Sequence, residues 1–322
     1  MRAVSQAAFH RPVLVAQCLE LLAAAPGHLV VDATLGDGGH AEAILERTAP
    51  GGRLIALDRD PEALRIAEGR LARFGARVNF EHASFRELEA VLARLAIGSV
   101  DGVLFDLGVS SRQLDQPARG FRFADESAAE TPLDMRMDDS RGETAAELLA
   151  RASEAELAAW FRDFGELPGA QRLARTLVAR RRERPLSTSA DLLGALRQAR
   201  VGGGRRHHPA TLVFQALRIV VNDELGALAE GLEAAIRALA PGGRLCVIAY
   251  HSLEDRLVKR TFEQEARGCV CPPRQPVCTC GRRPRLERIT RRAVRAGEDE
   301  LRSNPRARSA KLRAARRLAE AA

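Results

Sequence analysis

The stretch Val30-Val31-Asp32-Ala33-Thr34-Leu35-Gly36-Asp37-Gly38-Gly39-His40 decides the fold of this chain. The apolar run from Leu29 to Val31 predicts a buried strand, and residues 41–46 predict a helix. A strand, a glycine-rich turn and a helix bring bare backbone and the free N–H groups of a helix N-terminus close to a ligand. The turn therefore predicts a nucleotide-type site in an α/β protein.

Further strands follow at short intervals. Buried apolar runs predict strands at residues 54–58, 77–80 and 100–106, with helical patterns between them. This alternation predicts a parallel sheet covered on both faces by helices, with ligands at the carboxyl ends of the strands. A helix over residues 225–239 and a fifth strand over residues 245–250 resume the pattern late in the chain.

Between the fourth and fifth strands the alternation stops for about a hundred residues. A loop-like segment at residues 116–139 precedes a series of amphipathic helical patterns. We therefore expect a smaller helical domain at residues 114–215, inserted into a core formed by residues 1–113 and 216–322.

Asp58 ends the second predicted strand, 20 residues after Gly38. A carboxylate at that place and distance commonly accepts hydrogen bonds from the ribose of a bound nucleoside. The alternative is a helix cap, but Asp60, next to Pro61, fits the cap better.

The turn fits two classes of cofactor. A dinucleotide would place its pyrophosphate at the helix N-terminus, where the carboxylates of Asp32 and Asp37 would repel it. The same carboxylates suit the cationic amino group of a methionine moiety. This charge pattern favours S-adenosylmethionine over a dinucleotide.

The net charge of the 322-residue chain is +8, and it is unevenly distributed. From Arg256 to the end there are 17 Arg, 2 Lys and 7 acidic residues, a net charge of +12. Such a basic C-terminal region predicts a polyanionic partner, most simply nucleic acid. A general preference for Arg over Lys would explain the residue type but not the clustering.

No apolar run has the length of a membrane span, and residues 1–10 lack the pattern of a signal peptide. We therefore expect a cytoplasmic protein with no membrane partner. The sequence leaves the choice between monomer and homodimer open.

Four of the six cysteines are clustered: Cys269, Cys271, Cys278 and Cys280. In a cytoplasmic chain such a cluster indicates a metal site before it indicates disulfides, and four thiolates can hold a structural Zn²⁺. Reduced surface thiols are the alternative. The isolated Cys18 and Cys246 are expected to be buried apolar residues.

Several motifs together resemble the bacterial ribosomal RNA small subunit methyltransferase H family. They span about His10 to Arg313 and are the segments at residues 32–40, 105–115, 132–137, 250–255 and 304–313. The resemblance implies a class I (Rossmann-like) methyltransferase, a doubly wound α/β sheet with an inserted helical substrate-recognition domain. It also implies methyl transfer from S-adenosylmethionine to N4 of a cytidine of 16S rRNA, near the decoding centre of the small ribosomal subunit.

The same resemblance implies the residues that contact the cofactor. They are Gly38, Gly39, His40, Asp58, Phe85, Asp106 and Gln113. The two glycines would let backbone approach, and Phe85 would stack on or pack against adenine unless it is a core aromatic. His40 would otherwise be a polar residue at a helix start.

Methylation of an amine that is conjugated with a ring needs a hydrogen-bond acceptor beside the amine. Our hypothesis is that Asp106 accepts from the N4 amine or positions the donor, with Ser110 and Ser111 orienting the base. Further candidates for substrate contacts are Asp134, Arg136, His251 and Ser252.

Three other functions fit parts of the pattern. A methyltransferase of DNA or of a small molecule would share the cofactor site, although the insertion and the basic end argue against a small molecule. A dinucleotide-dependent oxidoreductase would bind NAD. A non-enzymatic ribosome-assembly factor would keep only a vestigial pocket.

Overall fold

The computed structural model describes residues 12–122, 131–202, 208–269, 271, 275, 277 and 279–319. The chain forms two compact units, which are described separately: one holds residues up to Gly108 and from Leu225 onward, the other Val109–Glu224. The insertion expected at residues 114–215 is thus longer at both ends. Val109 packs against the apolar core of the second unit, and the helix that starts at Pro209 continues to Asn222.

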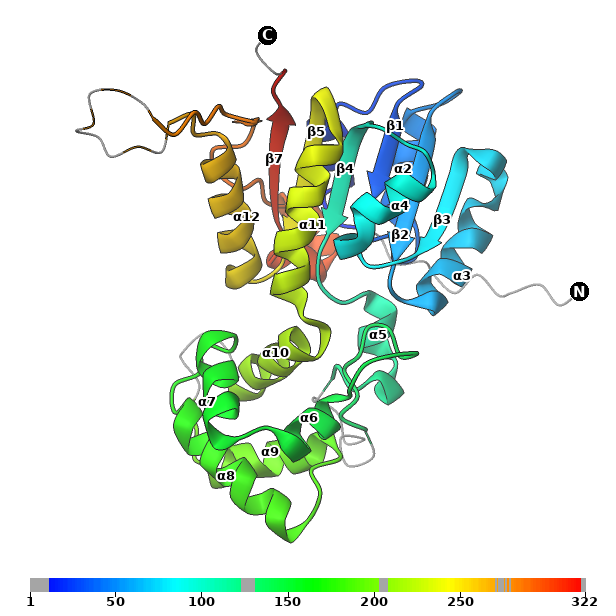
Figure 1. Ribbon diagram of the computed structural model, residues 1–322. Coiled ribbons are helices and arrows are strands. Elements are labelled where there is room, and N and C mark those ends of the chain that lie inside the picture. Colours follow the sequence, from blue (N-terminus) through cyan, green and yellow to red (C-terminus); the bar gives the residue numbers. More distant parts are fainter. Residues whose placement is uncertain are drawn as a thin grey trace, which may run out of the picture. The chain divides into compact units, whose positions relative to one another are not determined.

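The first unit contains one seven-stranded sheet in the order β3-β2-β1-β4-β5-β7-β6 (Figure 1). The first five strands are parallel, and β7 runs antiparallel to both of its neighbours. This doubly wound order confirms the predicted α/β fold class. The strands are β1 Leu29–Asp32, β2 Arg53–Asp58, β3 Val78–His82, β4 Val100–Asp106, β5 Leu239–Ala249, β6 Leu286–Arg288 and β7 Lys311–Arg317.

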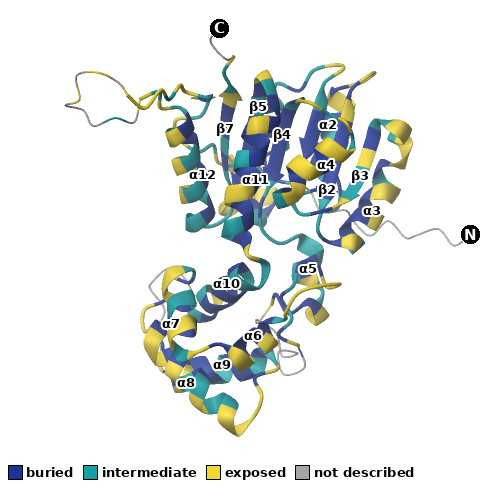
Figure 2. Ribbon diagram, in the orientation of Figure 1, coloured by how far each residue is buried: buried dark blue, intermediate teal, exposed yellow. Residues whose placement is uncertain are grey.

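Helices cover both faces of this sheet, because successive strand residues point to opposite sides and both sides are apolar. Val31 and Phe105 belong to the core under α4, α11 and α12, the helices seen in front of the sheet in Figure 1. Val30 and Leu104 belong to the core under α1, α2 and α3. The strands β1, β2, β4 and β5 are accordingly buried along most of their length (Figure 2). The helices are α1 Val15–Leu22, α2 Gly39–Arg47, α3 Pro61–Leu71, α4 Leu88–Arg94, α11 Glu224–Ala238, α12 Ser252–Glu265 and α13 Glu298–Ser303.

Two parts of the sheet differ from the sequence-based expectation. β5 begins at Leu239 rather than at Leu245, because Leu239 pairs with Val100 before a register shift over residues 240–243. β6 and β7 were not expected at all. Arg residues occupy much of β7, but Leu312, Ala314 and Ala315 are buried, so the strand is held by small apolar side chains.

The second unit is helical, as the sequence predicts. Its apolar core is drawn from all the main helices, and Phe161 and Leu173 are fully buried in it. Hydroxyl side chains fix the helix starts: Thr144, Ser153 and Thr188 each form a reciprocal capping box with an acidic residue three positions later. The helices are α5 Ser111–Asp115, α6 Ala145–Arg151, α7 Glu154–Asp163, α8 Ala170–Glu183, α9 Ser189–Gln198 and α10 Pro209–Asn222.

Among the described residues, no helix combines the length and the hydropathy that crossing a bilayer requires. Residues 1–11, part of the predicted loop at 116–139, and Cys278 lie outside the described residues.

Candidate functional site

The ionisable residues of the predicted site gather at one edge of the first unit. Asp32, Asp58 and Asp106 are the last residues of β1, β2 and β4, and Tyr250 directly follows β5. His40 is the second residue of α2. Parallel strands end at the same edge of a sheet, so these side chains lie close together, and contacts join several of them. This edge is therefore the candidate site.

The glycine turn lies between β1 and α2, as the sequence predicts, but its glycines have different structural roles. Gly36 has φ +52° and Gly38 has φ +79°, a left-handed conformation that favours glycine. A Cβ atom on Gly38 would lie 3.3 Å from Ala67 Cβ, and one on Gly39 would lie 2.8 Å from Pro12 Cγ. A Cβ on Gly36 would meet nothing within 4 Å. Gly38 and Gly39 therefore allow close protein packing, and Gly36 borders open space.

Asp58 supports this turn directly. Its Oδ2 accepts a hydrogen bond from the Gly36 N–H at 2.7 Å, and its Oδ1 accepts one from the Asp60 N–H at 2.8 Å. Burial raises the pKa of Asp58, although both N–H groups oppose that shift. Each carboxylate oxygen can accept a second hydrogen bond, so a ribose contact remains available. Asp60 caps α3 by accepting from the Glu62 N–H, as the sequence predicts.

Asp32 carries an atom without a partner. The carboxylate is 1% exposed, and its Oδ1 accepts from the Thr34 N–H at 3.2 Å. Its Oδ2 makes no hydrogen bond within the described part of the chain. Burial raises the pKa of Asp32 to about 7, and the neighbouring His40 opposes the rise. A buried carboxylate oxygen without a partner suits a cationic group of a ligand.

Asp106 is held from three sides. Its N–H donates to Thr34 Oγ1 at 2.6 Å, its Oδ1 accepts from the Tyr250 hydroxyl at 2.8 Å, and its Oδ2 lies 3.5 Å from His40 Nε2. The Asp106 side chain is 24% exposed, so it is partly open to a substrate. This carboxylate can therefore act as an oriented acceptor.

The carboxylate of Asp106 raises the pKa values of both His40 and Tyr250. Burial disfavours the charged form of His40, but Asp106, Asp32 and a hydrogen bond to the Val13 backbone outweigh it and raise its pKa. Burial and Asp106 together raise the pKa of Tyr250 well above its usual value, so the phenol stays a hydrogen-bond donor. Tyr250 and Thr34 were not among the site residues predicted from the sequence. The only tyrosine of the chain, at the end of a predicted strand, was the available signal.

Phe85 lies after β3, at the start of a short 3₁₀ turn, Phe85–Glu87. Its ring is 7% exposed and meets Phe105 edge-on, with centroids 5.4 Å apart. A Cβ on Gly231 of α11 would lie 2.8 Å from its Cδ2, so that glycine makes room for the ring. The Arg59 guanidinium lies 5.4 Å from the ring centroid. Phe85 is thus largely a core aromatic, and its contact with adenine stays a prediction.

The second unit holds three further predicted site residues. Ser110 caps α5: its Oγ accepts from the Gln113 N–H at 3.2 Å, and Gln113 Oε1 accepts from the Ser110 N–H at 2.9 Å. Ser111 is the first residue of the helix. Ser110 and Gln113 therefore have a structural function as a capping box. Their roles toward base and cofactor stay predictions.

The remaining substrate candidates have partners of their own. Arg136 donates to both carboxylate oxygens of Asp134, each at 2.8 Å, which lowers the pKa of Asp134. His251 caps α12 and Ser252 is its first residue.

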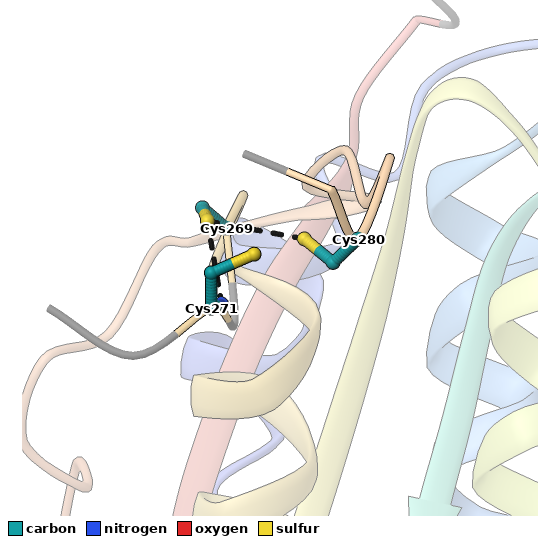
Figure 3. A group of neighbouring side chains, drawn as sticks. All are labelled: Cys269, Cys271 and Cys280. Atoms are coloured by element: carbon teal, nitrogen blue, oxygen red, sulfur yellow. Dashed lines mark hydrogen bonds between the residues drawn. The ribbon is translucent and has the colours of Figure 1, made fainter. Parts of the chain in front are cut away.

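Three of the four clustered cysteines are described, and their Sγ atoms lie within 4.8 Å of one another: Cys269, Cys271 and Cys280 (Figure 3). Hydrogen bonds from the backbone of Thr279 and Cys280 lower the pKa of Cys271. Cys18 and Cys246 are buried, as expected.

Much of the basic C-terminal region is neutralised within the first unit. Arg285 pairs with Glu233 and Glu265, and Lys311 and Arg313 pair with Asp255. Other Arg side chains are exposed and have no carboxylate partner in the described part of the chain, among them Arg260, Arg291, Arg292 and Arg295. The charge excess is therefore smaller in effect than the sequence suggests, but not absent.

Comparison with known proteins gives consistent matches over nearly the whole chain. Residues 7–318 match the sequence model of the MraW methylase family. A protein of Heliobacterium modesticaldum, described as ribosomal RNA small subunit methyltransferase H, is 49% identical over 312 residues, which cover 96% of this chain and 98% of that protein. A protein of the same description from Symbiobacterium thermophilum is 50% identical over 314 residues, covering 97% and 98%.

Proposed function

Because the chain belongs to the MraW methylase family, we propose that it transfers a methyl group from S-adenosylmethionine to N4 of one cytidine of 16S rRNA, near the decoding centre of the small ribosomal subunit. Membership of this family makes the chain an S-adenosylmethionine-dependent methyltransferase of ribosomal RNA. The base, the atom and the position are our proposal.

The site residues fit the methyl donor. Asp58 keeps acceptor capacity for the ribose hydroxyls, and Gly36 borders open space beside it. Oδ2 of Asp32, buried and without a hydrogen-bond partner among the described residues, suits the ammonium of the methionine moiety. These groups match a cationic nucleoside better than the pyrophosphate of a dinucleotide, which two carboxylates would repel.

The proposed chemistry depends on Asp106 as a hydrogen-bond acceptor. S-adenosylmethionine supplies an electrophilic methyl group, and the cytidine amine must present its nitrogen to it. The N4 lone pair is delocalised into the ring, so a hydrogen bond from the amine to a fixed acceptor favours attack. Asp106 is such an acceptor, because the Tyr250 hydroxyl orients its carboxylate, Thr34 holds its backbone N–H, and its side chain stays partly exposed. As the bond between N4 and the methyl carbon forms, the bond between that carbon and the sulfonium sulfur breaks, so that S-adenosylhomocysteine leaves. N4 gives up a proton, which Asp106 or water accepts.

We also propose that the second unit recognises the substrate, with Ser110 and Ser111 orienting the base. This follows from their place in the chain, four and five residues after Asp106. The exposed Arg side chains near the C-terminus are suited to RNA phosphates. Recognition by RNA shape as well as by base favours an assembled or nearly assembled small subunit as substrate.

An assay with defined substrates tests this function. The purified protein is incubated with isotopically labelled S-adenosylmethionine and small subunits from a strain that lacks the gene, and the rRNA is digested to nucleosides. We expect label in N4-methylcytidine from one position of 16S rRNA. Label in another nucleoside, or no label in 16S rRNA, would refute the proposal. Binding of NAD is measured to test the oxidoreductase alternative. Protein-free 16S rRNA is used as a second substrate to test whether an assembled subunit is needed.

A further inference from the structure

The connection between α12 and β6, residues 266–285, is poor in apolar residues. Apart from cysteine and proline, Ala266, Val270 and Val277 are its only apolar residues. Val277 is 70% exposed, and Cys269 and Cys280 are exposed as well. A segment that cannot bury an apolar core is usually stabilised by disulfides or by a metal ion.

The two ends of this connection are nevertheless fixed to the first unit. The Arg285 N–H donates to the Glu265 carbonyl oxygen at 2.9 Å, and the Arg285 guanidinium makes two hydrogen bonds with Glu233, at 2.9 and 2.8 Å. Arg282 donates to the carbonyl of Gln264 at 3.0 Å and to Glu265 Oε1 at 2.8 Å. Hydrogen bonds and ion pairs therefore hold the two ends of the connection together, and the cysteines lie between these ends in the sequence.

The three described thiols converge on one point (Figure 3). Cys269 Sγ and Cys280 Sγ are 3.8 Å apart. With Zn–S bonds of about 2.3 Å, two thiolates of a tetrahedral zinc site are separated by about 3.8 Å. Such a distance is far longer than an S–S bond of about 2.05 Å. The spacing thus matches shared metal ligation and not a disulfide.

Backbone N–H groups point at the sulfurs. The Cys271 N–H donates to Cys269 Sγ at 3.4 Å, and the backbone of Thr279 and Cys280 hydrogen bonds to Cys271. N–H···S contacts of this kind orient thiolates and offset their negative charge around a metal. We propose that Cys269, Cys271 and Cys280 are ligands of a structural Zn²⁺ ion that fixes the α12–β6 connection. No part of the proposed methyl transfer depends on this ion.

Metal analysis of the full-length protein tests the proposal. After purification without chelators, we expect inductively coupled plasma mass spectrometry to find about one equivalent of Zn²⁺ per chain. Reconstitution with Co²⁺ should give thiolate-to-cobalt charge-transfer bands and the intense d–d bands of a tetrahedral site. Titration of the thiols with an organomercurial should release the Zn²⁺ in step with modification.

Variants assign the ligands. Cys269→Ser, Cys271→Ser and Cys280→Ser should each lower Zn²⁺ content or affinity on the order of tenfold or more. Val277→Ser, an exposed change in the same connection, and Cys246→Ala, a buried thiol elsewhere, should keep the metal. Binding of S-adenosylmethionine by each variant checks that it is folded.

Three results would overturn the proposal. They are less than about a tenth of an equivalent of Zn²⁺ in the reduced wild-type protein, iron with sulfide in place of zinc, or a Cys269–Cys280 disulfide found by peptide mass spectrometry of the unreduced protein.

Discussion

The hydroxyl of Tyr250 donates a hydrogen bond of 2.8 Å to Oδ1 of Asp106, and this contact joins the ends of two neighbouring strands, β5 and β4. The two residues are 144 positions apart in the chain. The contact orients a partly exposed carboxylate at the edge of the sheet where ligands of doubly wound folds bind.

Asp106→Asn should lower kcat for methyl transfer by about 10²–10³-fold, because it replaces a charged acceptor by a group that also donates. Tyr250→Phe should lower kcat by about tenfold, since it removes one hydrogen bond that orients Asp106. In both variants KM for the RNA should change much less than kcat. Steady-state kinetics, together with thermal unfolding as a control for folding, measures both effects. Full turnover by Asp106→Asn with normal cofactor binding would remove Asp106 from the chemistry.

Asp58→Ala should weaken S-adenosylmethionine binding by about 10–100-fold, because hydrogen bonds to a charged group contribute about 1.5–3 kcal/mol. The neighbouring Asp60→Ala is the matched control. It removes the α3 cap and should cost about 1 kcal/mol of stability while leaving the affinity nearly unchanged. Isothermal calorimetry and urea unfolding separate the two effects. Equal losses of affinity in both variants would contradict a direct contact between Asp58 and the ligand.

S-adenosylmethionine should bind more tightly as the pH rises through about 7, because Asp32 then ionises and can pair with the ammonium of the ligand. Affinity at pH 6 should be up to about tenfold weaker than at pH 8. Asp32→Asn should bind weakly and without this pH dependence. A wild-type affinity that is flat over this range would contradict the pairing.

The same carboxyl affects stability with the opposite trend. The folded chain holds the Asp32 proton more tightly than the unfolded chain, whose pKa is near 3.8. The stability contributed by the protonated form is therefore complete below about pH 4 and is lost as the pH rises through about 7. The ligand-free Asp32→Asn variant should escape this loss, and urea unfolding at several pH values measures it.

Gly231→Ala should destabilise the protein by about 1–3 kcal/mol, because the added Cβ would lie 2.8 Å from the ring of Phe85. Gly69→Ala in α3 is the matched control: its Cβ meets nothing within 4 Å, and helix propensity should stabilise by up to about 1 kcal/mol. Both changes are glycine to alanine inside a helix, so only packing differs. If urea unfolding gave equal changes for both variants, the close contact with Phe85 would be refuted.

Local signals in the sequence were enough for the first half of the sheet. Apolar runs that end in acids located β1, β2 and β4, and Asp60 next to Pro61 identified the α3 cap. These features depend on neighbours in the chain, which a pattern records.

Long-range pairing explains what could not be predicted. The Arg-rich sequence of β7 resembles a basic tail. It forms a strand because it pairs with β5 and β6 and because ion pairs such as Arg313–Asp255 hold it. The pairing of Asp106 with Tyr250 depends on strand order, and the packing of Phe85 on Gly231 depends on how α11 lies on the sheet. The sequence therefore predicted the acidic residues at this edge, but not Tyr250 or the contacts between the side chains there.

The proposed activity is methylation at N4 of one cytidine in 16S rRNA, and a methylation map of that RNA tests it in the cell. The gene is disrupted, then complemented with wild-type protein or with Asp106→Asn, and 16S rRNA fragments are analysed by mass spectrometry. We predict that one cytidine loses its N4-methyl group on disruption, regains it with wild-type protein and does not regain it with Asp106→Asn. An unchanged map after disruption would contradict the account.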